Sequence, residues 1–517
     1  MSTAILKHFE NLFTKKGIVK NMNKIKNTKS ICPECLKVLD ATIFEDDGKV
    51  YIKKECPTHG FFQELYWSDY EQYLRVEKLR YDGEGLNNPR TKKEKGCPYD
   101  CGICPEHKSH TALAIIDVTN RCNLTCPVCF ANAAAAGYVY EPTREEITRM
   151  LENLRANDPV PATALQFSGG EPTIRNDLFD LVRKAKELGF RHVEVNTNGL
   201  RLAQSVDYCR QLKEAGVSTI YLQFDGLTSE VYKFIRGVDL LETKMKAIEN
   251  CRQAGLHSIV LVVTLVKGVN DGQLGDIINF AVKNFDVVRC INVQPVSLCG
   301  RIPQKERDRM RITITDFMRL VEEQTGGKVK VSDFYPVPTV VPVSKAVGAL
   351  KDKRYVEFTA HPHCGMATYL FVEDGEIIPI TRYASVEKFV ETMRKVYENA
   401  SKGSKNKAKI RLFGALRHVK FSFLRKYLLR VLTEGSYKAL GDLQRNAILL
   451  SAMHFMDPYN FDLERVQRCV IHYAVPDGRI IPFCTMNSIH RAEIERKMGI
   501  PIKEWKSKHK VEISQLA

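Results

Sequence analysis

The stretch TNRCNLTCPVCF, residues 119–130, holds three closely spaced cysteines, Cys122, Cys126 and Cys129. A closed structural metal site takes four protein ligands. Three thiolates leave one metal position open to another ligand, and open positions are where metal chemistry takes place. The motif therefore predicts a reactive metal centre, and the rest of the chain must supply its surroundings.

The composition is that of a globular, metal-binding protein. The chain has 517 residues, enough for roughly two to four domains. Many of its 16 cysteines fall in short C-x-x-C spacings, which are typical of metal thiolate sites in a reducing cytoplasm rather than of disulfide frameworks. The N-terminus lacks the apolar segment of a signal peptide, and the longest apolar run, residues 258–266, is too short to span a bilayer. We therefore expect a cytoplasmic protein, and its net charge of +16 favours anionic partners such as nucleic acid or a membrane surface.

The N-terminal part predicts a first metal unit. Residues 1–27 are lysine-rich with apolar residues at helical spacing, which indicates an amphipathic basic arm. In residues 28–92, CPEC and CPTH flank a strand–turn–strand pattern around DDGK, which resembles a zinc ribbon or a rubredoxin-like knuckle. Three thiolates and one imidazole suit zinc, whereas a rubredoxin-type iron wants a fourth thiolate, so the choice of metal stays open. The predicted ligands are Cys32, Cys35, Cys56 and His59.

A second cysteine group, CPYDCGIC at residues 97–104, repeats the C-x3-C-x2-C spacing. Proline and glycine keep it a loop. The spacing favours an iron–sulfur cluster held by Cys97, Cys101 and Cys104. The alternative is a second zinc knuckle completed by His107.

From residue 112 onward, strands and helices alternate. The helix TREEITRMLENL opens with a capping box, and three later helices end at Gly189, Gly216 and Gly255 before apolar strands. This pattern predicts βαβ units and about six parallel strands, as a partial barrel or an open sheet within residues 93–345. Ligands bind at the carboxyl ends of such strands, so the opening motif lies on the functional face.

The last part, residues 346–517, predicts a C-terminal helical and metal-binding domain. Residues 399–411 indicate an exposed linker. Residues 411–433 indicate one basic amphipathic helix, which either lies on an anionic membrane surface or packs on the core. Three separated cysteines also occur here: Cys364, Cys469 and Cys484.

Cys122-x3-Cys126-x2-Cys129 after a first barrel strand resembles the signature of the radical S-adenosylmethionine (SAM) superfamily. SGGEPT, residues 168–173, follows the second strand and resembles the GGE motif that receives the methionine amino group. Polar residues follow the third and fourth strands and would face ribose and carboxylate. The resemblance implies SAM-binding residues Ser168, Gly169, Gly170, Glu171, Thr197, Asn198, Gln223 and Asp225.

The resemblance also implies the chemistry and the fold. Three thiolates would hold a [4Fe–4S] cluster whose fourth iron chelates SAM, and reductive cleavage would give a 5′-deoxyadenosyl radical. The implied architecture is an α/β partial (β/α)6 radical SAM barrel, with an N-terminal metal-binding ribbon and a C-terminal auxiliary-cluster domain.

Cysteine-rich members of the superfamily often carry auxiliary clusters, so we expect three [4Fe–4S] clusters and one mononuclear iron or zinc. One auxiliary cluster is assigned to the CPYDCGIC loop and the other to Cys364, Cys469 and Cys484. Cys299 is a candidate fourth ligand to either. The cysteines not assigned to metal are two expected packed thiols and one that precedes its strand away from the active face, namely Cys209, Cys251 and Cys290.

The order of all these parts resembles the archaeal tetraether lipid synthase family. That resemblance implies carbon–carbon coupling between terminal methyl carbons of isoprenoid chains on archaeal ether phospholipids, with an auxiliary cluster holding the first carbon. It further implies a long apolar tunnel, a position peripheral to an anionic membrane, an electron donor such as ferredoxin or flavodoxin, and no nucleic acid partner. The alternatives are a radical enzyme that modifies a peptide or a tRNA, and a non-enzymatic electron-transfer or zinc-ribbon protein.

Overall fold

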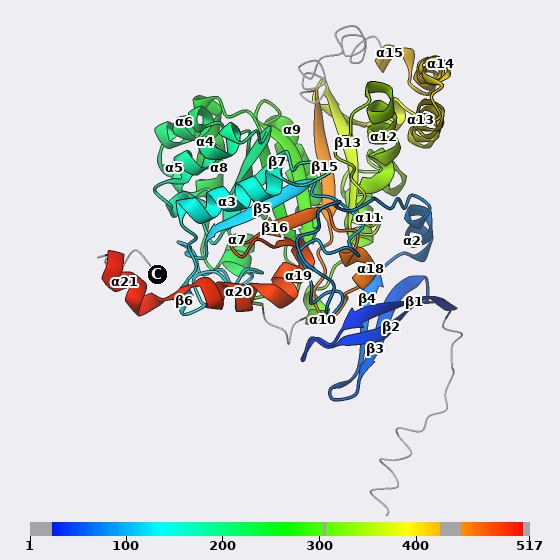
Figure 1. Cartoon of the computed structure of the whole chain (residues 1–517). Coiled ribbons are helices and arrows are strands. Elements are labelled where there is room, and N and C mark those ends of the chain that lie inside the picture. Colours follow the sequence, from blue (N-terminus) through cyan, green and yellow to red (C-terminus); the bar gives the residue numbers. More distant parts are fainter. Residues whose placement is uncertain (1–22, 303–306, 424–445, 510–517) are drawn as a thin grey trace, which may run out of the picture.

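The computed structural model describes residues 23–302, 307–423 and 446–509, and it begins with a four-stranded ribbon (Figure 1). The ribbon is antiparallel in the order β1-β2-β3-β4, and the predicted strand–turn–strand around DDGK forms its β2 and β3. Residues 23–27, assigned to the arm from sequence, belong to β1, and the rest of the arm lies outside the described residues. The bounds are β1 Asn23–Ile31, β2 Val38–Asp46, β3 Lys49–Cys56 and β4 Gly60–Trp67, followed by α2 Tyr70–Glu77.

The six predicted barrel strands all form, and each pairs in parallel with the next. They are β5 Leu113–Thr119, β7 Ala164–Gly169, β8 His192–Thr197, β9 Thr219–Gln223, β10 Ile259–Leu265 and β11 Val288–Pro295. Two strands from the C-terminal part extend this sheet. β15 (Ala447–Met453) pairs in parallel with β11, and β16 (Ile471–Ala474) pairs in parallel with β5. The parallel part of the sheet is therefore wider than the six-stranded partial barrel expected from sequence.

Antiparallel strands complete both edges of the sheet. β13 (Gly365–Glu373) lies beside β15 and carries β12 (Tyr335–Pro336) and β14 (Glu376–Pro379), while β17 (Ile480–Pro482) pairs with β16. A small separate pair, β6 (Tyr138–Val139) with β18 (Ile500–Pro501), ties the end of the chain to the barrel.

Helices cover the outer face of the parallel strands (Figure 1). Their bounds are α3 Arg144–Arg155, α4 Leu178–Glu187, α5 Leu200–Gln204, α6 Val206–Ala215, α7 Ser229–Arg236, α8 Leu241–Ala254, α9 Leu274–Lys283, α10 Arg307–Met310 and α11 Ile314–Gln324. The C-terminal part adds α12 Val341–Lys351, α13 Val386–Ser401, α14 Lys405–Ala415, α15 Phe421–Phe423, α18 Leu463–Val466, α19 Phe483–Thr485, α20 Arg491–Met498 and α21 Ile502–His509.

Local sequence signals explain how these helices begin and end. The predicted capping box is present on α3, where Thr143 and Glu146 each bond the other's backbone N–H. The predicted glycine ends are also confirmed: Gly216 caps α6 with φ +108°, a left-handed conformation that favours glycine. Cys209 and Cys251 are buried between α6 and α8 with their sulfurs 3.9 Å apart, as expected of packed thiols.

The prediction for residues 399–433 is wrong where the structure describes them. The expected linker at 399–411 lies largely within α13 and α14. The expected helix at 411–433 breaks after Ala415 into a short 3-10 turn and α15, and residues 424–433 lie outside the described part. The apolar stripe was misread because Ala408 and Ala415, which face α12 and α13, are too small to dominate a hydrophobic pattern.

Candidate active site

The loop that carries Cys122, Cys126 and Cys129 follows β5, and all three side chains line one large cavity. Cys129 N donates to Arg301 O (3.0 Å), Arg301 N donates to Cys129 O (2.9 Å), and Arg301 Nε donates to Cys126 O (2.7 Å). Burial raises the pKa of both Cys122 and Cys126, so each free thiol holds its proton near neutral pH. The positive iron of a cluster favours the thiolate form at such a site, so this donor set fits a [4Fe–4S] cluster.

The two glycines of SGGEPT allow the end of β7 to approach the cysteine loop. A Cβ on Gly169 would lie 2.1 Å from Thr119 O, and a Cβ on Gly170 would lie 2.0 Å from Arg121 O. Side chains at either position would push the two loops apart. The glycines therefore bring the polar end of β7 against the metal-binding loop.

Glu171 holds two SAM-motif loops together. It is buried, and its carboxylate accepts from Thr173 N (3.1 Å), Thr197 Oγ1 (2.7 Å) and Asn198 N (2.8 Å). Burial raises its pKa despite these hydrogen bonds. The glutamate thus fixes the loop after β8 relative to the loop after β7, as well as lining the cavity.

A buried lysine supports the same edge of the barrel. Asn198 Nδ2 donates to Asn123 Oδ1 in the cysteine motif (2.7 Å). Lys244 Nζ, from α8, donates to Asn198 O and to Gln223 Oε1 (2.8 Å). Lys244 is fully buried, and burial lowers its pKa to about 7.

Asp225 lies behind the cavity wall rather than on it. Its carboxylate accepts from Arg236 Nε (2.7 Å) and Nη2 (2.8 Å) and from Thr264 N (3.1 Å). Arg236 does line the cavity, next to Cys126 and Cys129, and the charge of Asp225 raises its pKa against the opposing effect of burial. The aspartate therefore acts by holding a guanidinium beside the cluster site.

The cavity has a volume of about 850 Å³, in the upper part of the range for small-molecule sites. Because side chains alternate along a strand, every second residue faces it. One wall is polar, formed from β7, β8, β9 and β11 by Gln166, Ser168, His192, Glu194, Asn196, Thr219, Tyr221, Gln223, Asn292 and Gln294. A second part of the lining is apolar and aromatic, formed by Leu113, Ile115, Phe130, Leu449, Phe455, Met456, Ile471, Tyr473 and Phe483, while Val260 and Val262 of β10 lie between the polar strands β9 and β11.

The sequence-based exclusion of Cys290 from the active face is wrong. Cys290 lies within β11, beside Ser451, and lines the cavity. The expectation was that Cys290 precedes its strand, but β11 begins at Val288 and therefore includes Cys290. Burial raises the pKa of Cys290 to about 12.

The four predicted ligands of the ribbon converge. Ligand atoms of Cys32, Cys35, Cys56 and His59 all lie within 4.8 Å of one another. His59 Nδ1 is 3.5 Å from both Cys32 Sγ and Cys56 Sγ. The pKa of Cys56 is lowered to about 6, first by the backbone N–H of Thr58. Three sulfurs and one imidazole at this spacing fit a tetrahedral metal such as zinc.

The CPYDCGIC cysteines also lie together. Cys97, Cys101 and Cys104 line one small cavity with His107. The thiol of Cys97 contacts that of Cys101 and is the first cause of a lowered Cys101 pKa. His107 Nε2 is already 2.8 Å from Cys469 O and 3.1 Å from His472 Nε2, so only its Nδ1 is left for a metal.

The structure brings the three late cysteines into one region as well. Cys364 immediately precedes β13, Cys469 precedes β16, and Cys484 lies in α19. Cys484 is half-buried, and its pKa is raised first by desolvation and then by the charges of Cys469 and Cys364. Three thiolates in one such region repel one another, and a cation between them would offset that repulsion.

Arg465 supplies part of the missing positive charge. It is 1% exposed, its Nε donates to Cys364 Sγ (3.3 Å), and its Nη2 donates to His454 O. Its Nη1 is buried without a hydrogen-bond partner, and none of the ion pairs formed within the described residues involves Arg465. A buried guanidinium needs a counter-charge, and the thiolates of a metal cluster fit that need.

Cys299 lies near the group formed by Cys364, Cys469 and Cys484. Its Sγ is 3.4 Å from Ser488 Oγ and 3.9 Å from Met456 O, and Met456 N donates to Cys484 Sγ (3.3 Å). One residue, Met456, therefore contacts both sulfurs. Burial raises the pKa of Cys299 to about 11.

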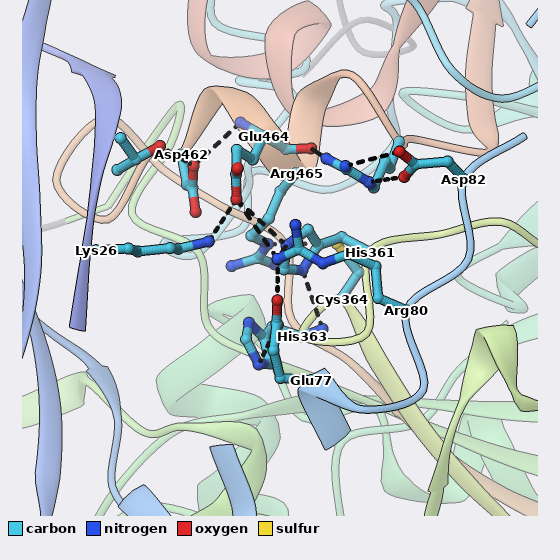
Figure 2. Close-up of polar contacts among 12 residues, drawn as sticks. Lys26, Glu77, Arg80, Asp82, His361, His363, Cys364, Asp462, Glu464 and Arg465 are labelled. Carbon is cyan, nitrogen blue, oxygen red and sulfur yellow. Dashed lines mark hydrogen bonds and ion pairs between the residues drawn. The ribbon is translucent and has the colours of Figure 1, made fainter. Parts of the chain in front are cut away.

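A charged network joins the ribbon to the Cys364 loop (Figure 2). Glu464 pairs with Lys26 of β1 and with Arg80, which in turn pairs with Glu77 at the end of α2. Ligand atoms of Glu77, His361 and His363 lie within 4.8 Å of one another, which is close enough for a metal.

The charges nearby argue against a metal at this second group. Arg80 Nη2 is 3.1 Å from His361 Nε2, and the lysine and arginine already balance the carboxylates (Figure 2). A divalent ion would face these cations at short range. We therefore interpret the network as the support of the Cys364 loop.

These features define a radical SAM enzyme, and comparisons with known proteins agree. The Radical SAM superfamily model matches residues 116–281, and the model named HMPTM N-terminal zinc ribbon domain matches residues 24–68. The chain is 51% identical over 499 residues to the 7,8-dihydro-6-hydroxymethylpterin dimethyltransferase of Methanocaldococcus jannaschii, covering 94% of this chain and 98% of that protein. The chain belongs to the family of that enzyme.

Other matches cover less than half of the chain. A probable GTP 3′,8-cyclase of Methanothermobacter marburgensis is 30% identical over 201 residues, which is 39% of this chain and 62% of that protein. Among solved structures, Streptococcus suis SuiB is 21% identical and covers 42% of this chain and 46% of its own, with a TM-score of 0.34.

The tetraether lipid synthase prediction is wrong. A relative that matches nearly the whole chain is named for a pterin substrate, not for archaeal ether phospholipids. The resemblance misled because ribbon, cluster loop and late cysteines are shared by radical enzymes with different substrates. The cavity differs from the expected apolar tunnel, since one wall is polar. No helix in the described residues is long and apolar enough to cross a membrane.

Sequence reasoning missed the residues that shape this site from outside the motifs. Arg236, Lys244 and Arg301 lie on α7, on α8 and after β11, far from the cysteine motif in sequence. A basic residue in a helix normally indicates a solvated face. The fully buried Lys244 interrupts the apolar face of α8, and only that interruption could have signalled it.

Proposed function

We propose that the chain is a radical SAM methyltransferase that adds two methyl groups to 7,8-dihydro-6-hydroxymethylpterin. The observation that carries the proposal is the match to the M. jannaschii enzyme, which spans ribbon, barrel and C-terminal part alike. The amphipathic cavity supports it, because a pterin is a flat ring with one hydrogen-bonding edge.

Bound together, a [4Fe–4S] cluster and SAM would supply one kind of chemistry, the removal of hydrogen from an unactivated carbon by a carbon-based radical. Cys122, Cys126 and Cys129 would hold the cluster. The SGGEPT backbone and Asn198 would hold SAM. Arg236, held by Asp225, places a positive charge beside the cluster cysteines.

The remaining metal sites complete the proposal. We assign one auxiliary cluster to Cys97, Cys101 and Cys104, and a second to Cys364, Cys469 and Cys484 with Cys299 as the candidate fourth ligand. The ribbon ligands bind one zinc. Electrons come from a small reductant protein such as ferredoxin or flavodoxin. Met456 lines the cavity and its backbone N donates to Cys484 Sγ (3.3 Å), so this residue connects the late cysteines to the cavity.

A substrate comparison tests the proposal. The reconstituted protein is incubated without oxygen with a reductant, SAM and either the dihydropterin or GTP, which the name of the M. marburgensis relative contains. The proposal predicts that the dihydropterin raises 5′-deoxyadenosine formation above the substrate-free level and that GTP does not. Stimulation by GTP alone would overturn it.

A further inference from the structure

Glu194 is a cavity carboxylate that the SAM motifs do not use. It lies on β8, two residues before Asn196, and its side chain faces the barrel interior. Apart from Glu171, it is the one acidic residue among the described residues that line the cavity. Its side chain is 14% exposed, so it is largely removed from bulk water.

The partners of Glu194 leave room for a ligand. Gln166 Nε2 donates to Oε2 (3.0 Å), and His192 Nε2 lies 2.8 Å from Oε1. No lysine or arginine of the described residues forms an ion pair with it. Each carboxylate oxygen can accept a second hydrogen bond, so Glu194 can still receive two N–H groups side by side.

Tyr221 adds a donor on the neighbouring strand β9, where it stands opposite Asn196 in the sheet register. It is close enough for the charge of Glu194 to raise its pKa, after burial. Tyr221 Oη accepts a hydrogen bond from Gln294 Nε2 (3.0 Å). The hydroxyl proton of Tyr221 therefore points away from Gln294. Carboxylate and phenol together form a recognition edge with two acceptors and one donor.

A second polar group in the cavity also lacks a partner. Asn292 on β11 is 9% exposed and lines the cavity, and its Oδ1 is buried without a hydrogen-bond partner. In the sheet register Asn292 pairs with Val262 of β10, which in turn pairs with Gln223 of the SAM site. Asn292 therefore lies nearer the carboxyl ends of the strands than Glu194 does. Buried amide oxygens are rarely left unsatisfied, so this one points to a ligand.

We infer that Glu194 binds the amino-pyrimidine edge of the pterin, in the half of the barrel away from SAM. This inference rests on the proposed function. The 2-amino group and the ring N–H beside it form a guanidine-like donor pair, and a carboxylate accepts such a pair bidentately. The ring carbonyl next to them accepts from Tyr221. The aromatic wall of Phe455 and Phe483 packs against the flat ring.

This placement orients the substrate for reaction. Asn196, on the same face of β8, and Thr197 of the SAM site follow Glu194 by two and three residues, roughly 7–10 Å along the strand. That length is comparable to a bicyclic ring. With its amino edge at Glu194, the pterin directs the reduced ring and its hydroxymethyl group towards SAM, and Asn292 Oδ1 can accept a hydrogen bond from that end.

Binding measurements on the holoenzyme test the inference. Anoxic calorimetry compares 7,8-dihydro-6-hydroxymethylpterin with its 2-oxo counterpart, the corresponding lumazine, on wild type and on Glu194→Gln. The control is Glu187→Gln, a carboxylate on α4 that is 66% exposed. Iron content and circular dichroism establish that each variant has folded.

Wild type and the control are expected to bind the pterin at least tenfold more tightly than the lumazine, whose oxygen faces the carboxylate. Glu194→Gln is expected to lose roughly 10- to 100-fold in pterin affinity and most of this preference. A residue that only supported the fold would not change the ratio of the two ligands.

Three results would overturn the inference. Equal pterin affinity in Glu194→Gln and wild type would remove Glu194 from the site, and equal binding of both ligands by wild type would remove the amino-edge contact. If wild type binds no pterin, the proposed function fails, and the inference fails with it; the first two results leave the proposed function standing.

Discussion

At the scale of single residues, Arg465 connects the chain most directly to its auxiliary metal site. The guanidinium is buried, and a thiol and a carbonyl oxygen are its hydrogen-bond partners. Burying a charge in such surroundings is costly unless an opposite charge compensates it. The cluster that we propose at Cys364, Cys469 and Cys484 would provide that charge.

Arg465→Met should therefore lower the midpoint potential of one cluster. Removing a cation next to an anionic cluster disfavours the reduced form, which carries the additional negative charge. An anoxic redox titration followed by electron paramagnetic resonance measures the potential, with the exposed Arg183→Met on α4 as control. A variant with full iron content and an unchanged potential would contradict the assignment.

Lys244 predicts a pH dependence of stability. Its pKa is about 7 in the folded protein and 10.5 in a model chain. Between these values the unfolded chain binds the proton more readily, so the free energy of unfolding rises with pH, by at most about 1.4 kcal/mol per pH unit, and the effect is constant below about pH 7.

The measurement compares wild type with Lys244→Met by thermal unfolding at about pH 7 and about pH 9. The stability of wild type relative to the variant should increase with pH. Lys246→Met, an exposed neighbour on α8, is the matched control and should show no such change. A difference that stays flat across this window would show that Lys244 is charged in the folded state.

The residues of the site could be predicted only where they belong to a recognisable sequence motif. Cysteine spacing and SGGEPT lead to residues that the structure brings around one cavity. Glu194, Asn292 and Cys290 could not be found in this way, because a polar residue at every second strand position is also the pattern of a solvated sheet face. Knowing that this face is the barrel interior requires the fold.

At the scale of elements, the two ends of the ribbon are held differently. Ile43, Ile52 and Trp67 pack into the main hydrophobic core, whereas only Leu39 and the partly buried Phe62 pack around the four ligands. A metal therefore holds together the ligand end of the ribbon rather than the whole sheet.

Cys56→Ser should remove about one zinc per chain and leave the iron content unchanged. Serine is a poor ligand for zinc, and the three remaining donors do not close a tetrahedral site. Elemental analysis by mass spectrometry measures both metals, and Cys209→Ser, a packed thiol, is the control. Loss of iron rather than zinc would mean that the ribbon holds a rubredoxin-like iron.

Elements with strong local signals were predictable and those without were not. The six barrel strands follow from long apolar runs and glycine-capped helices. β16 has four residues and β15 follows a segment outside the described residues, and both gain their parallel partners from strands more than 150 residues away. Pairing over such separations leaves no local pattern.

At the scale of the whole molecule, the ribbon and the C-terminal part lie against each other rather than standing apart. Lys54 of β3 donates to Pro458 O (2.6 Å) and Tyr459 O (2.9 Å), and Tyr66 Oη donates to Asp462 Oδ2 (2.9 Å). Together with the network around Glu464, these contacts join the first and last parts of the chain next to Cys364 (Figure 2). The order of parts that suggested a lipid synthase describes this shared scaffold, whereas the substrate depends on the barrel interior.

Methylation of a pterin by this scaffold can be measured on the product itself. The reconstituted protein is incubated without oxygen with reductant, SAM, 7,8-dihydro-6-hydroxymethylpterin and the small-molecule fraction of a cell extract as a source of further one-carbon donors. Mass spectrometry follows the pterin, and Cys126→Ala, which removes one of the three thiolates at the cluster site, is the control. We expect pterins heavier by one and by two CH2 units with wild type and none with the variant. An unmodified pterin, in the presence of continued 5′-deoxyadenosine formation by wild type, would contradict this expectation.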